Sequence, residues 1–365
     1  MPNFTGQLNT NEIFASLFNM IIAEQVFSDN LSHNYNLVDE AREDGGLYGD
    51  TKLYYDADIL SSREWGADAE ATNLLQLHRP KAPNVQSIVL NRFRIVELTI
   101  DYYLSKRAWT GEGVFGQFTA LMLSQLGETK RVFENTMYNV YIGNVSSNEG
   151  KQKVALTFTL PQGVAAGTEE ANRLTGQFIA KSIADLIVEL KDYSRDYTDR
   201  KNLRSYSEDA LKFVWNSKFV NQITYVDLPT IFHNEELRKH LTDRILPPKY
   251  FGSGISTTSA AAGSNERAAE EVAIGTTDYF GGDQITAGTG NGVERKIYTI
   301  NPNIVCKVFV KLPPIMSAFE IETSFFNPKS LTENHYLIWG FNELEYLKNY
   351  PVIEVSLAVS EAPSA

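Results

Sequence analysis

The sequence predicts an α+β fold on three observations. Two strand-like segments, Thr51–Leu60 and Asn84–Leu90, form an extended two-stranded arm early in the chain. A long amphipathic helix opens at Glu112 and runs to about Val140, with its apolar side chains on one broad stripe. Further strand-like segments and a second helix fill the rest of the 365 residues, which is enough chain for one large or two ordinary domains.

Composition limits what the protein can be. Hydrophobic residues make up 43% of the chain and aromatic residues 12%, which predicts a sizeable core. The net charge of −12 disfavours sequence-independent nucleic-acid binding, because such binding needs clustered lysine and arginine. The first 45 residues are more acidic still, with seven acidic side chains against Arg42 alone. The single cysteine, Cys306, excludes a disulfide framework and a cysteine-rich metal site.

The amino terminus predicts a protein that is made and folded in a cytoplasm. Met1-Pro-Asn-Phe4 lacks the positive charge of a signal peptide. No apolar run approaches the roughly 20 residues that span a membrane. We therefore expect no membrane partner.

The first predicted element is a helix, Asn9–Phe27. Asn9 and Glu12 form a variant of the capping box, and apolar residues that include Phe14 and Leu17 recur at helical spacing. This pattern fits a surface helix folded on its own core, and it fits equally an arm that docks under neighbouring subunits.

The extended arm says most about function. A two-stranded ribbon is only marginally stable alone, so its apolar residues need a partner surface, and the simplest partner is another copy of the chain. These residues are Leu53, Tyr54, Tyr55, Leu74, Leu75 and Leu77. The polar centre of the arm, Ser61–Ala71, carries Trp65 without apolar neighbours, which predicts that another subunit buries this tryptophan. The alternative is a half-exposed tryptophan on a loop.

The middle of the chain is predicted from periodicity and capping. Phe93–Leu104 and Lys151–Leu160 alternate as strands. Gly127 costs the long helix about 1 kcal/mol relative to alanine and allows a bend. A second helix begins at Thr168, with acidic residues at its positive end. The charged loop Asp192–Arg204 is predicted to be solvated or to form intersubunit salt bridges.

The last part of the chain is predicted to be strands around a glycine-rich loop. Gly252–Gly292 is rich in Gly, Ser, Thr and Ala, and its Gly288-Thr-Gly-Asn-Gly292 lacks the spacing of a nucleotide-binding loop, so a surface loop is predicted. Cys306 lies on an apolar strand, which predicts a buried thiol. The predicted elements are a strand at Leu211–Trp215, a turn at 216–221, a helix at Asn234–Leu241, and strands at Ile297–Leu312, Phe319–Phe326, 336–341 and 350–358.

The residue pattern offers no catalytic chemistry. None of the five histidines has a second histidine or a carboxylate at metal-ligand spacing, and the chain has no nucleophile elbow or phosphate loop. Asp56-Ala-Asp58 lacks the remaining ligands and the glycine of a calcium loop. We therefore expect no catalytic residue, no cofactor, no metal and no enzyme activity.

Several short segments match one family of proteins in combination. They are Gly49-Asp-Thr-Lys-Leu53, Asn73-Leu-Leu75, Arg79-Pro-Lys-Ala-Pro83, Thr99-Ile-Asp-Tyr-Tyr-Leu-Ser-Lys-Arg-Ala-Trp109, Gly127-Glu-Thr-Lys-Arg131, Val214-Trp-Asn-Ser-Lys218, Leu228-Pro-Thr-Ile-Phe232 and His335-Tyr-Leu-Ile-Trp339. With these segments, and in its order of elements, the chain resembles the major capsid protein of tailed bacteriophages, which has the Hong Kong 97-type coat fold. The resemblance covers nearly the whole chain, and the segments look most like coat proteins of small short-tailed phages.

The resemblance implies a division into domains. Residues 1–45 would be an N-terminal arm, and residues 46–92 an extended β-hairpin loop that lies over a neighbour. Residues 93–160 would be a peripheral domain with a spine helix at 112–143. Residues 161–314 would form an axial domain that includes the Gly/Ser-rich loop 252–292, and residues 315–365 would return to the peripheral domain.

The resemblance also implies a function and partners. The chain would self-assemble through pentamers and hexamers into an icosahedral or prolate head that encloses double-stranded DNA without specific binding, which fits its acidity. A separate scaffolding protein, a portal and decoration proteins would be its partners. Assembly would take place in the bacterial host cytoplasm, and the product would be the virion capsid. The intersubunit contact candidates are Phe14, Leu17, Leu53, Tyr54, Tyr55, Trp65, Leu74 and Leu75.

Some relatives of this kind cross-link through a Lys–Asn bond. Lys52 and Lys81 lie in the hairpin region, but the sequence identifies no partner for them, so no cross-link is predicted. Two alternatives stay open for the function. A tail or appendage protein of the virion would form rings or tubes, and a soluble enzyme would show a deep pocket with titratable groups of perturbed pKa.

Overall fold

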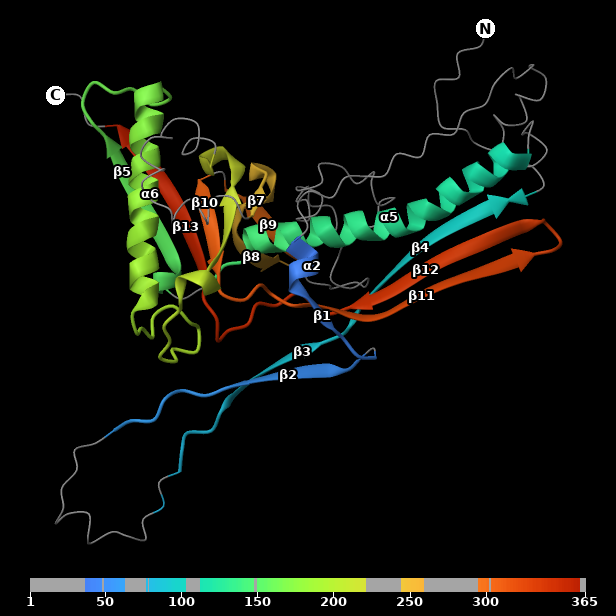
Figure 1. The fold of residues 1–365 in the computed structure, drawn as a ribbon, viewed down its shortest axis with the longest axis horizontal. Helices are drawn as coiled ribbons and strands as arrows, with labels where there is room; N and C mark the ends of the chain where they lie inside the picture. The colour runs from blue at the N-terminus through green and yellow to red at the C-terminus, as the bar shows by residue number, and fades with distance from the viewer. Residues whose placement is uncertain are drawn as a thin grey trace.

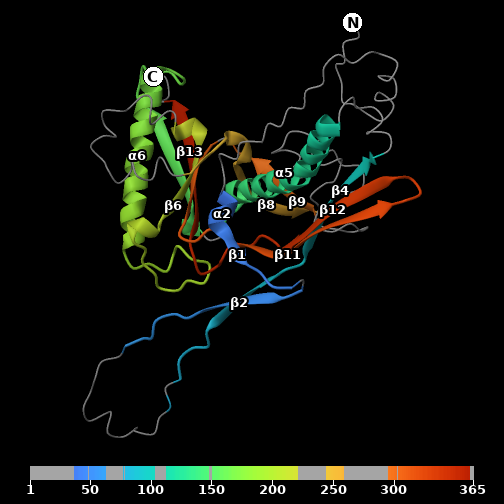
Figure 2. The ribbon, with the colours of Figure 1, turned by 45° about the vertical axis from the view of Figure 1, so that its right-hand side comes forward.

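A computed structural model describes residues 37–47, 49–62, 77, 79–102, 112–147, 150–220, 244–258, 295–301 and 303–361. Within these ranges the chain forms two main β-sheets, each with a long helix along it, and a hairpin that projects from them (Figure 1). The hairpin also stands away from both sheets after a 45° turn (Figure 2). The predicted α+β class is confirmed.

The first sheet has four strands and packs against the long helix α5 (Glu112–Asn144). Its order is β1 (Arg42–Asp44), β11 (Ile315–Asn327), β12 (Thr332–Phe341) and β4 (Arg92–Asp101). Strand β12 pairs antiparallel with both β11 and β4, and β1 lies parallel to β11. The predicted long helix is confirmed and ends at Asn144, about one turn beyond the predicted Val140, and it follows the sheet for most of its course (Figure 1).

Aromatic packing joins α5 to this sheet. The ring of Phe133 meets Trp339 and Phe341 edge to face, with centroids 5.9 and 6.1 Å apart. The guanidinium of Arg94 lies 4.8 Å from the Phe133 centroid, a distance at which a cation–π contact forms. The short helix α2 (Leu37–Ala41) covers the same core with three buried side chains.

The second sheet has five strands and packs against helix α6 (Glu169–Lys191). Its order is β5 (Lys153–Leu160), β13 (Val352–Glu361), β10 (Ile304–Phe309), β6 (Lys212–Asn216) and β7 (Ile245–Leu246). The helix begins where it was predicted, and Thr168 caps it, because its hydroxyl accepts a hydrogen bond of 3.2 Å from the Ala171 N–H. The helix buries Ile179, Ile183, Leu186, Ile187 and Leu190 against the sheet.

Strand β10 is buried at all six positions because both of its faces are covered. Val305, Cys306 and Val308 belong to the core beneath α6. Ile304 and Phe309 belong to the core that contains α5. One strand therefore joins the two cores, and the predicted burial of Cys306 is confirmed.

The hairpin consists of β2 (Thr51–Asp56) and β3 (Asn84–Val89), which pair antiparallel. This confirms the predicted two-stranded arm. The first strand is shorter than the predicted Thr51–Leu60, because the last pair is Asp56 with Asn84 and no further ladder is described. Ile88 and Leu90 anchor the base of the hairpin in a small core with Met316 and Leu347.

Three predictions need correction. The turn predicted at 216–221 begins a helical turn at residues 217–220. The first part of the predicted Gly252–Gly292 loop is a strand, β8 (Gly252–Thr258), which pairs with β9 (Arg295–Ile300). The strand predicted at Ile297–Leu312 is interrupted, since β9 and β10 belong to different sheets. In addition, α2 and β1 form where no element was predicted from the sequence.

Three short 3-10 turns complete the described elements, at Gly150–Gln152, Glu208–Ala210 and Pro248–Tyr250. The predicted helices Asn9–Phe27 and Asn234–Leu241 lie outside the described residues. The five-stranded sheet combines strands from residues 153–160, 212–309 and 352–361, so it draws on three of the predicted domain segments. The domain boundaries themselves stay a prediction.

Candidate assembly surfaces

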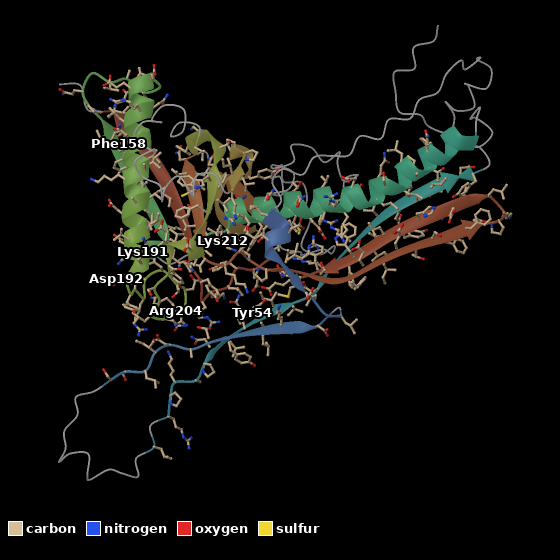
Figure 3. All side chains as sticks on the ribbon, viewed as in Figure 1. Tyr54, Phe158, Lys191, Asp192, Arg204 and Lys212 are labelled. Atoms are coloured by element: carbon tan, nitrogen blue, oxygen red, sulfur yellow. The ribbon has the colours of Figure 1, made fainter. Side chains whose placement is uncertain are left out.

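The base of the hairpin is fixed by a charged cluster around Glu43 on β1. Lys52 Nζ and Lys311 Nζ lie 2.5 and 2.8 Å from its carboxylate oxygens, and the Tyr54 hydroxyl donates to it at 2.8 Å. Burial by itself would raise the pKa of Glu43, but the hydrogen bonds from Lys311, Lys52 and Tyr54 outweigh it and lower the pKa to about 2. The cluster therefore ties β2 to the four-stranded sheet and turns Tyr54 towards its own chain (Figure 3).

The opposite side of the hairpin is apolar and exposed. Leu53 and Tyr55 keep 48% and 65% of their surface exposed. Val85 is the cross-strand partner of Tyr55, and Val89 is the partner of Thr51; both valines are exposed as well. We call the surface formed by Leu53, Tyr55, Val85 and Val89 the outer hairpin face. A surface of this kind on a projecting ribbon needs a covering partner.

The four-stranded sheet also has an exposed apolar side, opposite α5. Phe93 and Ile95 on β4 and Ile321 and Phe325 on β11 are between 46% and 63% exposed. Strand register places Ile338 of β12 between Ile95 and Ile321, and the rings of Phe93 and Phe319 have centroids 5.3 Å apart. We call the surface formed by Phe93, Ile95, Phe319, Ile321, Phe325 and Ile338 the open sheet face.

The two faces belong to one continuous segment. From residue 84 to residue 100, odd-numbered residues are exposed and even-numbered residues are buried or half-buried, without a break at the junction of β3 and β4. Side chains alternate between the two sides of an extended strand. Val85, Val89, Phe93 and Ile95 therefore project from the same side, and the outer hairpin face and the open sheet face lie next to one another rather than facing.

The stem of the hairpin is gripped by the loop 192–204 that follows α6. Arg195 forms a salt bridge with Asp58, and Asn202 donates to Asp56. Arg204 Nη2 donates to the Ala57 carbonyl at 2.9 Å, and Arg200 Nη2 to the Val85 carbonyl at 2.9 Å. We call this loop the clasp. Figure 3 shows Asp192 and Arg204 at the end of α6 that faces the hairpin.

The clasp favours the charged form of the Asp58 carboxylate on the hairpin. The hydrogen bond from Arg195 is the main cause that lowers the pKa of Asp58, and the backbone N–H of Leu203, 3.0 Å from Asp58 Oδ1, adds to it. Together they bring the pKa to about 2. The prediction of a solvated or intersubunit loop at Asp192–Arg204 missed this contact, because the partner lies 137 residues away in the same chain.

Three of the eight predicted contact residues lie in the described part of the chain. Leu53 and Tyr55 lie on the outer hairpin face, whereas Tyr54 lies on the inner side at Glu43. Phe14, Leu17, Trp65, Leu74 and Leu75 lie outside the described residues. An intersubunit role for all eight stays a prediction.

The open sheet face was not predicted from the sequence, although β4 carries a signal for it. Phe93 and Ile95 have odd numbers, whereas Val96, Leu98 and Ile100 have even numbers, so the two sets lie on opposite sides of the strand. Apolar residues on both sides are typical of a strand that is covered on both sides. Only one of these sides is covered by α5, so the other remains available for a partner.

Metal-binding clusters and membrane-spanning helices are both absent from the described part of the chain. No group of three or more His, Cys, Asp or Glu side chains that could hold a metal ion occurs there. Nor does any helix among the described residues combine the length and hydrophobicity needed to cross a bilayer.

The arrangement as a whole matches that of phage capsid structures. No family model matches the sequence, and no curated protein does so either. The capsid structure of Staphylococcus phage Andhra contains a similar chain, with a TM-score of 0.63 and 10% identity over 93% of this chain and 88% of that one. A chain in the structure of the head fiber and inner core protein gp22 of native bacteriophage P68 has a TM-score of 0.57 and 10% identity, over 93% of this chain and 91% of that one.

These two likenesses define the fold class. The chain has an α+β fold that it shares with phage capsid structures, as the resemblance in sequence implied. At 10% identity the likeness extends to the fold and not to individual residues. The assignment of α5 as a spine helix stays a prediction.

Proposed function

We propose that this chain is the major capsid protein of a tailed bacteriophage. In this proposal it self-assembles, through pentamers and hexamers, into the icosahedral or prolate head that encloses the double-stranded DNA genome. The shared fold supports the class of protein. The observation that carries the proposal is a pair of exposed apolar β surfaces, the outer hairpin face and the open sheet face, within a single subunit.

The geometry of these surfaces calls for another copy of the chain. They lie side by side on one extended segment, so in this conformation they cannot bury one another. Covering the outer hairpin face of one subunit with the open sheet face of the next joins two different surfaces. Such a contact is heterologous, and it produces a ring, such as a pentamer or a hexamer, when its rotation closes. The hairpin 46–92 would then lie over a neighbouring subunit.

The role is structural rather than catalytic. The chain is acidic, with a net charge of −12, which suits a shell that contains DNA without binding it tightly. The remaining partners belong to the same proposal: a separate scaffolding protein, a portal and decoration proteins. Assembly in the bacterial host cytoplasm and residence in the virion follow from the same role.

Electron microscopy tests the proposal directly. The purified chain is examined by sedimentation and negative staining, alone and in the presence of the proposed scaffolding protein. Closed shells of uniform size are expected. Rings or tubes would favour a tail or appendage protein, and a monomer that stays monodisperse in both preparations would overturn the proposal.

A matched pair of substitutions locates the contact. Ile321 on the open sheet face and Val188 on α6 are both exposed and β-branched. Ile321→Lys is expected to lower shell yield at least about tenfold, because a contact of ~1.4 kcal/mol per subunit already changes an association constant tenfold. Val188→Lys is expected to leave the yield unchanged. Equal yields from both variants would place the contact elsewhere.

A further inference from the structure

The hairpin is held at two separate places along its length. At its base, the Glu43 cluster and the small core of Ile88, Leu90, Met316 and Leu347 fix it to the four-stranded sheet. Further out, the clasp holds residues 56–58 at the end of β2 and Val85 on β3. Because a two-stranded ribbon is only marginally stable alone, the outer attachment decides where the rest of the hairpin points.

The clasp is itself fixed to segments that border the five-stranded sheet. Asp199 accepts hydrogen bonds from Ser147, Gln152 and Tyr346, at 2.5, 2.8 and 2.5 Å. Two backbone hydrogen bonds of 2.9 and 3.0 Å join Ser194 to Arg204 and close the loop. The clasp therefore fixes the position of the hairpin relative to the sheet beneath α6.

Backbone strain marks the same loop. Lys201 has a φ of +54°, in the left-handed region that a side chain disfavours. Its carbonyl accepts a hydrogen bond of 2.9 Å from Arg195 Nη1, the same guanidinium that binds Asp58. Strained residues persist where their surroundings hold them in place. The Lys201 carbonyl thus helps to hold the Arg195 guanidinium next to the hairpin.

The contacts of the clasp with the hairpin are polar. Arg195, Arg200, Asn202 and Arg204 donate to carboxylates or carbonyls, and the charged pair is partly exposed. Partly exposed ion pairs contribute little net stability and weaken with salt. The hairpin can therefore be released without disturbing either core, which separates the clasp from the apolar anchor at the base.

We propose that the clasp is a releasable device that sets the direction of the hairpin in the free subunit. Closed, it presents the outer hairpin face to a neighbour in one orientation, so that a subunit meets its partners already arranged for assembly. Opened, it leaves the hairpin attached at its base and free to change direction. The role in assembly rests on the proposed function, whereas the holding of the hairpin does not.

Hydrogen exchange on the unassembled subunit tests the holding. The double variant Arg195→Ala/Arg200→Ala removes contacts with both strands of the hairpin. Exchange of the amides in β2 and β3 is expected to accelerate about fivefold or more, while α6 and β10 keep their protection. Unchanged exchange in the hairpin would overturn the proposal.

Lys151→Ala is the matched control. Lys151 Nζ pairs with Asp196 of the clasp at 2.6 Å, and both side chains are exposed. The substitution removes a charged partner of the same loop without touching the hairpin, so hairpin exchange is expected to stay at the wild-type rate. Acceleration equal to that of the double variant would mean that any weakening of the loop has this effect, and would overturn a specific clasp.

A charge exchange and an assembly assay complete the test. Asp58→Arg and Arg195→Asp are each expected to accelerate hairpin exchange, and their combination is expected to slow it again.

Shell yield of the double alanine variant is expected to fall, or its particles to become irregular. Normal shells from a variant with a freed hairpin would overturn the role in assembly. Failure of the wild-type chain to form shells would count against the proposed function, and the exchange data would still decide the holding.

Discussion

Lys307 and Glu354 face each other across β10 and β13 in the five-stranded sheet, with Nζ 2.5 Å from Oε2 and no exposed surface on the lysine. Lys307 Nζ also donates to the carbonyl of Val145 at 3.0 Å, just beyond the end of α5. A cation is favourable there because the helix dipole is negative at its carboxyl end. Burial lowers the pKa of Lys307, and Glu354 opposes that shift.

Removing one member of this ion pair should destabilise the fold more than replacing both members. Lys307→Met leaves Glu354 buried without its cation, and the free energy of unfolding is expected to fall by about 3–5 kcal/mol. The double variant Lys307→Met/Glu354→Leu is expected to recover part of that loss, because no unpaired charge remains. Urea unfolding of the subunit measures both. A double variant less stable than the single one would contradict this account.

Two glycines in α5 should respond oppositely to alanine. No atom lies within 4 Å of the place that a Cβ on Gly127 would take, so Gly127→Ala is expected to stabilise the subunit by up to about 1 kcal/mol through helix propensity. A Cβ on Gly143 would lie 2.1 Å from the Tyr250 carbonyl oxygen, and Gly143→Ala is expected to cost about 1–3 kcal/mol through overpacking. Thermal unfolding measures each. Destabilisation by Gly127→Ala would show that the helix needs a glycine there.

The Glu43 cluster predicts a defined acid sensitivity. Its pKa falls from the ordinary 4.5 to about 2 in the folded state, so its stabilisation is complete above about pH 4.5 and is lost as the pH falls towards 2. Allowing for solvent screening, we expect about 1–2 kcal/mol from this group. Glu43→Gln should lower stability at pH 7 and flatten its decline between about pH 5 and pH 2. Parallel pH profiles for variant and wild type would rule out this contribution.

Cys306 should behave as a structural side chain. Burial raises the pKa of its thiol and withholds the reactive thiolate, with Lys307 opposing only weakly. We expect no labelling by a maleimide in the folded subunit and full labelling in urea. Cys306→Ala should cost about 1–2 kcal/mol, the scale of a small cavity, and should leave assembly normal. Rapid labelling of the native thiol would contradict the prediction.

Local signals in the sequence predicted the long elements well. The stripe of α5, the start of α6 at Thr168 and the pairing of β2 with β3 all depend on residues near one another in the chain, so periodicity and the acidic first turn of a helix suffice to find them. The domain boundaries that the resemblance implied have no such local signal and stay predictions.

Elements that depend on distant partners were missed. Strand β1 has three residues and exists because it lies beside β11, whose first residue Ile315 pairs with Arg42. Strand β8 has the composition of a loop and is extended because β9 pairs with it. The clasp has the charges of a solvated loop, and only the fold brings Asp58 to Arg195. The open sheet face became visible once the structure showed that α5 covers a single side of β4.

The unbroken alternation from residue 84 to residue 100 limits how this segment can change in length. Deleting a single residue near Asn91 would exchange the two sides of everything beyond it, turning Phe93 and Ile95 inward and exposing Val96 and Leu98. Removing two residues would preserve the sides and shift only the hairpin relative to the sheet. In chains that share this segment, insertions and deletions here should therefore come in even numbers.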